Sequence, residues 1–217
     1  MTPFTVLTAR AAPLMRDNID TDTIIPSREM RTVAKTGLAD GLFAGWRYTS
    51  IGSRTPDPEF ILNRPERRGF SILVTGDNFG CGSSREHAVW ALAEYGIRAI
   101  VAPSFNPIFR ANCIANGVVP VSVERDTVER LAAMTEADPS LLFTLDLPRQ
   151  EMRVGDDVIF GFEIDPESKD ALISGLDPIA RTLRLRDQIL AFVKTDRQLR
   201  PWIYSATATD HSARETA

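Results

Sequence analysis

The chain has 217 residues, of which 43% are hydrophobic and 25% are charged, and its formal net charge is −4. This ordinary globular mixture excludes a wholly disordered chain, a collagen-like repeat and a coiled coil. The longest apolar run, at residues 88–93, is far too short to span a membrane. The slightly acidic balance argues against a broad nucleic-acid surface. Because the N-terminus lacks a basic segment followed by an apolar one, we expect a cytoplasmic protein.

Few side chains suited to metal binding are present. The chain has two cysteines, Cys81 and Cys113, and two histidines, His87 and His211. Two cysteines are too few for a secreted disulfide scaffold. They are also too few to hold an iron–sulfur cluster or a structural zinc ion from this chain alone. We therefore expect no metal on this chain.

The first strong motif is the segment Asn18–Pro26, which reads N-I-D-T-D-T-I-I-P. Its front half is polar and turn-forming, and Asp22 precedes an apolar run that Pro26 ends. Two carboxylates at Asp20 and Asp22 are typical of cation binding, but also of an Asx-turn or a helix cap. Both interpretations stay open at this point.

The central region alternates short apolar runs with helical patterns. Residues 36–65 are rich in glycine, proline and arginine and indicate mainly loop. We expect strands at 70–75, 97–102 and 118–123, and helices at 86–95, at 106–116 and from Asp126, where Glu129 completes a capping-box spacing. This alternation predicts an α/β fold with a parallel sheet covered by helices.

The C-terminal third differs in character. Short strands are predicted at 141–147, 151–154 and 158–164, followed by a helix that Asp177 caps and Pro178 begins. Ile179, Leu183, Leu190 and Val193 are expected to form a stripe that faces the core of the protein. We expect one domain over residues 1–200 and a flexible tail over 201–217.

The densest chemical signal is the segment 76–87, which reads G-D-N-F-G-C-G-S-S-R-E-H between a strand and a helix. Gly80 and Gly82 allow the backbone to approach a ligand and to turn its N–H groups toward it. The helix N-terminus and Arg85 add positive charge, and a guanidinium suits a carboxylate. The pattern predicts a site for a small anion, either a carboxylate or a phosphate. It matches neither a Walker loop nor a dinucleotide fingerprint.

Structural interpretations exist for the same residues. Ser83 and Glu86 have the spacing of a capping box, so Ser83, or Ser84 in the same turn, could simply cap the helix. Arg85 could be a solvated first-turn residue, and Cys81 suits packing better than nucleophilic attack. His87, one turn into the helix, is more often a hydrogen-bonded structural residue than a base.

Four motifs in order give a resemblance: Asn18–Pro26, Asp77–Ala88, Ala102-Pro103-Ser104-Phe105 and Gly175-Leu176-Asp177. Together they resemble the small-subunit family of bacterial 3-isopropylmalate dehydratases, in the aconitase superfamily, over residues 4 to 200. The resemblance implies a swivelling β/β/α three-layer domain like the last domain of aconitase. It also implies a separate large subunit that holds a [4Fe–4S] cluster on three cysteines, and a small dicarboxylate substrate. The implied reaction is the dehydration of 2-isopropylmalate and rehydration to 3-isopropylmalate in leucine biosynthesis.

The resemblance also implies roles for individual residues. Ser83 matches the serine proposed as base for the carbon-bound proton, while Ser84 and Arg85 match the neighbours that bind its alkoxide and the substrate carboxylate. Asp22 matches an aspartate near the acid–base apparatus, and Gly80, Gly82 and His87 support the site. A further substrate arginine is implied but not located; the unranked candidates are Arg28, Arg47, Arg54 and Arg64. Alternatives are a small subunit for a related diacid, of citraconate or homoaconitate type, and a non-catalytic anion-binding module.

Overall fold

The computed structural model describes residues 1–30 and 34–204. The chain divides into two compact units, residues 1–176 and 177–217. The expected tail over 205–217, with His211, lies outside the described residues. In the part that is described, no helix is both long and apolar enough to cross a membrane.

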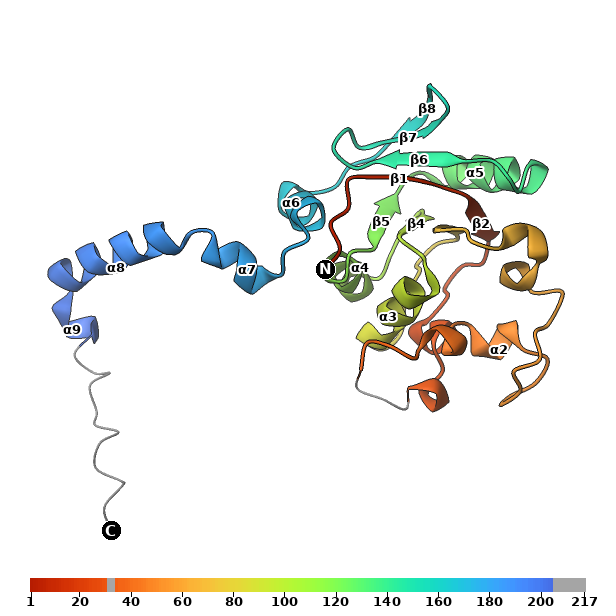
Figure 1. The fold of residues 1–217 in the computed structure, drawn as a ribbon, viewed down its shortest axis with the longest axis horizontal. Helices are drawn as coiled ribbons and strands as arrows, with labels where there is room; N and C mark the ends of the chain where they lie inside the picture. The colour runs from red at the N-terminus through yellow and green to blue at the C-terminus, as the bar shows by residue number, and fades with distance from the viewer. Residues whose placement is uncertain (31–33, 205–217) are drawn as a thin grey trace, which may run out of the picture. The chain divides into compact units, whose positions relative to one another are not determined.

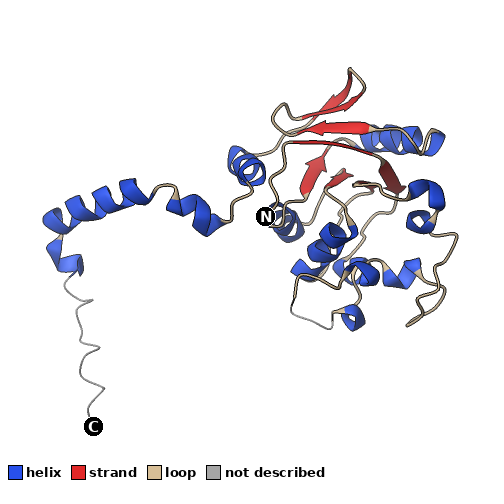
Figure 2. Ribbon diagram, viewed as in Figure 1, coloured by secondary structure: helices blue, strands red, loops and turns tan. Residues whose placement is uncertain are grey.

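Two four-stranded sheets form the centre of the first unit (Figures 1 and 2). The parallel sheet has the order β2-β3-β4-β5, formed by Ala11–Leu14, Ile72–Thr75, Ala99–Ala102 and Val119–Ser122. The antiparallel sheet has the order β1-β6-β7-β8, formed by Val6–Ala9, Phe143–Asp146, Glu151–Val154 and Asp157–Gly161. A single residue, Arg10, separates β1 from β2, so the chain passes directly from one sheet to the other.

The longer helices of this unit follow the strands. They are α3 (Glu86–Tyr95), α4 (Pro107–Ala115), α5 (Arg125–Ala137) and α6 (Pro166–Ser174). Two one-turn helices, α1 (Thr21–Ile24) and α2 (Ala44–Arg47), follow β2. Short 3-10 helices lie at Ser27–Glu29, Ala39–Gly41, Ile61–Asn63 and Pro65–Arg67.

Both faces of the parallel sheet are buried, which explains its continuous apolar strands. In β3, Leu73 points into a core shared with α1, α3 and α4, whereas Ile72 and Val74 point into a second core. That second core also contains Phe143 and Leu145 of the antiparallel sheet. The layers are therefore sheet, sheet and helices, and the predicted α/β, β/β/α three-layer fold is confirmed.

The longer helices of this unit begin in different ways. Asn106 caps α4 with its side chain, as an Asn-Pro start favours, and Gly117 has positive φ just after the helix. The predicted capping box at Asp126 and Glu129 is wrong: α5 begins at Arg125, and its N-cap residue Glu124 makes no side-chain cap. The extra residue moves Asp126 into the first turn, where its carboxylate faces the helix dipole favourably instead.

The second unit contains α7 (Pro178–Leu183), α8 (Arg186–Leu199) and α9 (Pro201–Tyr204). Asp177 caps α7 by accepting a hydrogen bond from the N–H of Ala180 at 2.7 Å, as predicted. The expectation of one continuous helix is wrong, because α7 ends at Leu183 and α8 begins at Arg186, while the placement of the apolar stripe against a core stays a prediction. Ile179, Leu183 and Leu190 are 73%, 60% and 55% exposed, since an amphipathic pattern specifies an apolar face but not what covers it.

Candidate functional site

The predicted site residues converge at one edge of the parallel sheet. Because all four strands run in the same direction, the segments after β2, β3, β4 and β5 emerge at their common carboxyl edge. The segment after β2 carries Asp22, and the segment after β3 carries Ser83, Ser84 and Arg85. The topology thus brings together motifs about 60 residues apart in sequence.

A polar network holds the beginning of the turn after β3. Asp17 accepts the backbone N–H of Asp77 at 2.8 Å and also Nη2 of Arg125 at 2.8 Å. The backbone N–H of Asp77, followed by Arg125, lowers the pKa of Asp17. Ser104, from the segment after β4, donates to Asp77 at 3.1 Å and accepts the N–H of Asn78 at 2.8 Å. Residues that follow all four parallel strands therefore fix the base of this turn.

Packing fixes the middle of the same turn. Phe79 is fully buried between Phe109 and Phe105, with ring centroids at 5.3 and 6.4 Å. Gly80 follows with φ of +75°, and a Cβ there would lie 2.1 Å from the Phe109 ring. Glycine is therefore required here for close approach, but to a packed phenylalanine rather than to a ligand. Gly82 has φ of +85° and turns the chain toward Ser83.

Ser83 and Ser84 lie exposed between this turn and α3. Neither hydroxyl has a hydrogen-bond partner within residues 1–30 and 34–204. The capping-box interpretation is wrong, because Arg85 occupies the N-cap position and no side chain caps the helix. The Glu86 carboxylate instead accepts Nδ2 of Asn116 at 2.8 Å and Nε1 of Trp90 at 3.3 Å. Both serine oxygens are thus free beside a helix N-terminus that carries positive partial charge.

Arg85 meets Asp22 in this structure. One guanidinium nitrogen, Nη1, donates to Oδ1 of Asp22 and lies 3.3 Å from Oγ of Ser27. Ser27 in turn donates to Asp22 at 3.2 Å. The other guanidinium donors of Arg85 have no acceptor in the described part of the chain, so they remain available to a carboxylate. Sequence reasoning missed Ser27, since only its position just after Pro26 hinted at a place near the site.

The two aspartates of the first motif have different roles. Asp20 caps α1 by accepting the N–H of Thr23 at 2.6 Å, so the cap interpretation is correct for Asp20. Asp22, half exposed, pairs with Arg85. Neither belongs to a group of three potential metal ligands among the described residues.

Cys81 and His87 lie near the serines, and both are partly buried. Burial, followed by the nearby charge of Asp20, raises the pKa of the Cys81 thiol, which disfavours the nucleophilic thiolate. The His87 ring packs against Trp90 with centroids 4.7 Å apart. Cys113 is buried in the core shared with α3 and α4, and burial strongly raises the pKa of its thiol.

Comparison with known proteins shows to which family this chain belongs. Residues 1–126 match the family model of the aconitase C-terminal domain. The 3-isopropylmalate dehydratase small subunit of Cupriavidus necator is 55% identical over 205 residues, covering 94% of this chain and 99% of that protein. The chain belongs to the 3-isopropylmalate dehydratase small-subunit family.

Other members of the small-subunit family agree. The relative from Rhodospirillum centenum is 45% identical over 202 residues and covers 93% of this chain and 98% of its own length. A crystal structure of 3-isopropylmalate dehydratase from Methanocaldococcus jannaschii superposes with a TM-score of 0.61 at 29% identity, covering 86% of this chain and 98% of that one. Sequence and fold therefore indicate the same family.

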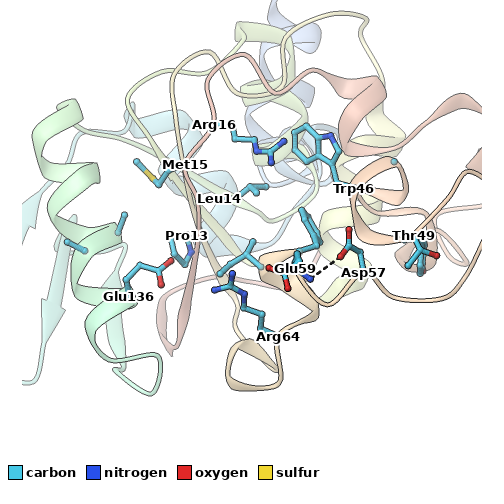
Figure 3. A pocket seen from close by; sticks show the side chains of 16 residues that line it. Pro13, Leu14, Met15, Arg16, Trp46, Thr49, Asp57, Glu59, Arg64 and Glu136 are labelled. Carbon is cyan, nitrogen blue, oxygen red and sulfur yellow. Dashed lines mark hydrogen bonds between the residues drawn. The ribbon is translucent and has the colours of Figure 1, made fainter.

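One cavity borders the site, and a second cavity shares a wall with the first. One, of about 450 Å³, is lined by Asp22, Ser27, Arg28 and Trp46, among others. The other, of about 670 Å³, shares Trp46 and contains Arg16 and Arg64 (Figure 3). The Arg16 guanidinium lies 4.4 Å from the Trp46 ring centroid. Trp46 therefore forms a common wall of the two cavities.

The structure separates the four unranked arginines. Arg47 donates to the carbonyl of Ala39 at 2.7 Å, and Arg54 pairs with Glu29 at 2.5 Å. Arg64 lines the larger cavity, away from Asp22. Arg28 alone among the four lines the cavity that contains Asp22 and Ser27. Its Nε lies 3.4 Å from Oε1 of Glu29, the next residue along the chain.

Proposed function

We propose that this chain works as the small subunit of a 3-isopropylmalate dehydratase, a hydro-lyase that isomerises 2-isopropylmalate to 3-isopropylmalate in leucine biosynthesis. Its family membership supports the reaction. The observation that carries the site assignment is local: two exposed, unbonded serine hydroxyls lie beside Arg85 at an uncapped helix N-terminus. This edge is half of an active site, and a large subunit completes it.

In this proposal Ser83 is the base that takes the carbon-bound proton. A serine hydroxyl is a poor base in water, so it must act as or near an alkoxide. The positive end of α3 and the guanidinium of Arg85 both favour an anion at this position. The proton then moves from the substrate carbon to Oγ of Ser83 as the hydroxyl group leaves, and the reverse transfer accompanies rehydration.

Arg85 and Ser84 bind the substrate in the same scheme. A substrate carboxylate approaches the donors of Arg85 that Asp22 and Ser27 leave unused. Ser84 donates its hydroxyl to the same anion or to the alkoxide. Arg28, which lines the cavity beside Asp22, is our candidate for the second carboxylate-binding arginine. Asp22, Gly80, Gly82 and His87 support this arrangement.

Two cysteines are too few for this chain to hold an iron–sulfur cluster by itself. Cys113 is enclosed in the core, and the described residues contain no group of three side chains placed to hold a metal. In the proposal a [4Fe–4S] cluster belongs to the large subunit, where it supplies a Lewis acid for the departing hydroxyl group.

Reconstitution with a large subunit under anaerobic conditions tests the proposal. We expect the complex to interconvert 2- and 3-isopropylmalate, and Ser83→Ala to abolish turnover while the subunits still assemble. Ser50→Ala, which changes an exposed serine outside the site, is the matched control and retains activity. If Ser83→Ala is fully active, the base assignment is wrong. If only a different malate-type diacid turns over, the substrate assignment is wrong.

A further inference from the structure

Thr21 has no role in the proposed reaction, yet it directly contacts the turn after β3 that carries Ser83. Its side chain is 1% exposed, and its hydroxyl donates a 2.9 Å hydrogen bond to the carbonyl oxygen of Ser83. Its backbone N–H donates to the carbonyl of Cys81, also at 2.9 Å. Thr21 therefore holds the turn at two points on either side of Gly82.

The contact to Ser83 matters because it is the hydrogen bond that holds this residue in the described part of the chain. Ser83 and Ser84 lie outside any helix or strand. Among their backbone and hydroxyl groups, the bond from Thr21 is the one hydrogen bond to either serine within residues 1–30 and 34–204. Gly82, with φ of +85°, precedes them and gives the backbone wide freedom. Without the bond from Thr21, no hydrogen bond in the described part of the chain would hold the two serines between Gly82 and Arg85, the N-cap residue of α3.

The neighbouring residue extends the same support. Asp22 binds the Arg85 guanidinium, so consecutive residues of α1 hold Ser83 and Arg85. The buried face of α1 carries Thr21 and its exposed face carries Asp22. The Asp20 cap fixes the start of α1. The one-turn helix α1, which we call the brace, thus supports the segment Ser83–Arg85.

From this geometry we infer that Thr21 is a positioning residue that fixes Ser83 for proton transfer. The inference rests on the proposed function of Ser83. A displacement of about 1 Å at a reacting group costs on the order of 10²-fold in rate. Because Thr21 touches the carbonyl of Ser83 but not Arg85, its loss should slow the chemical step more than it weakens substrate binding.

Two substitutions separate the hydroxyl from the rest of the side chain. Thr21→Val keeps the branched shape and removes the donor, whereas Thr21→Ser keeps the donor and removes a methyl group. In the reconstituted complex we expect Thr21→Val to lower kcat by about 10²-fold with KM changed less than about threefold. Thr21→Ser should retain most of the wild-type kcat. A wild-type kcat in Thr21→Val, or an equal loss in both variants, would overturn the inference.

A measurement without substrate keeps this test independent of the proposed function. Backbone ¹⁵N relaxation of the full isolated chain reports the mobility of the Ser83 and Ser84 amides. We expect lower order parameters at both amides in Thr21→Val and wild-type values in Thr21→Ser. Unchanged order parameters in Thr21→Val would contradict the claim that the brace restrains Ser83 and Ser84. A different result separates the two proposals. If Ser83→Ala is active while Thr21→Val has lower order parameters at these amides, Ser83 is not the base, but the support of Ser83 by Thr21 is upheld.

Discussion

Arg85 donates to the carboxylate of Asp22 across 63 positions of sequence, and the Ser27 hydroxyl contacts both partners. The pair joins the segment after β2 to the turn after β3. Because Asp22 is about half exposed, water screens the pair, and it contributes little to folding stability. The pair instead orients Arg85, because it holds this side chain with part of the guanidinium directed away from Asp22.

Replacement of Arg85 by lysine tests this orientation. Lysine keeps the charge but lacks the planar fork that binds a carboxylate with two hydrogen bonds. A charge-assisted hydrogen bond is worth about 1.5–3 kcal/mol, so we expect Arg85→Lys to lower kcat/KM by roughly 10- to 150-fold, mainly through KM. Steady-state kinetics of the reconstituted complex measure this loss. An effect confined to kcat would contradict a binding role.

Gly80 should be intolerant of any side chain. In Gly80→Ala the new methyl group meets the Phe109 ring at 2.1 Å, and the backbone must also keep φ of +75°. Overpacking costs about 1–3 kcal/mol and the left-handed conformation about 1–2 kcal/mol, so we expect a loss of roughly 2–5 kcal/mol in unfolding free energy. Gly155→Ala, with φ of +58° and open space, is the control and should lose only the second part. Urea denaturation of the isolated chain compares the two, and equal losses would refute the packing argument.

Glu94, near the C-terminal end of α3, provides a pH-dependent contact. Its carboxylate accepts the backbone N–H groups of Gly37, Leu38 and Ala39 at 2.7, 2.5 and 2.9 Å. Burial pushes the pKa of Glu94 upward, but these three N–H groups push it down further, and the net pKa is lowered. The stabilisation is therefore present above the unfolded pKa of about 4.3 and is lost as pH falls through the lower folded value.

The corresponding experiment compares wild type with Glu94→Gln across pH. We expect the variant to be less stable at pH 7, with the difference shrinking steadily below about pH 4.3. Denaturation midpoints from pH 3 to pH 7 show the trend. A difference that is constant over this range would show that the charge of Glu94 makes no contribution.

The two thiols should react slowly in the folded chain. Burial raises the pKa of both Cys81 and Cys113, and Asp20 raises that of Cys81 further. Because the thiolate is the reactive form, we expect alkylation by iodoacetamide at pH 8 to be slower than in the urea-unfolded chain. Cys81, partly exposed, should react before Cys113. Rapid modification of Cys81 in the folded chain would support the nucleophile interpretation instead.

Sequence patterns were sufficient for the central fold. Helix α3 lies at 86–95 as predicted, and the next two strands, β4 and β5, differ from their predicted ranges by at most two residues at either end. Strands β1 and β2 were not predicted, and in β2 Pro13 disfavours a strand. Pro13 is tolerated because β2 is an edge strand of its sheet.

The sequence motifs predicted which residues form the candidate site, but not which residues contact one another there. The glycine-serine-arginine run marks the turn because its composition is unusual between a strand and a helix. The partners that hold it, Thr21 and Ser27, belong to a different segment, and a hydroxyl residue there is compatible with many roles. Which loops meet depends on strand order, and the sequence periodicity leaves that order undetermined.

The single-residue passage at Arg10 has a mechanical consequence. One residue spans only about 3.5 Å, which leaves little length for one sheet to slide along the other. The shared core of Phe143, Val74 and their neighbours locks the same two sheets face to face. If the edge that carries Ser83 moves toward a partner, we expect the shared core to move both sheets together as one block.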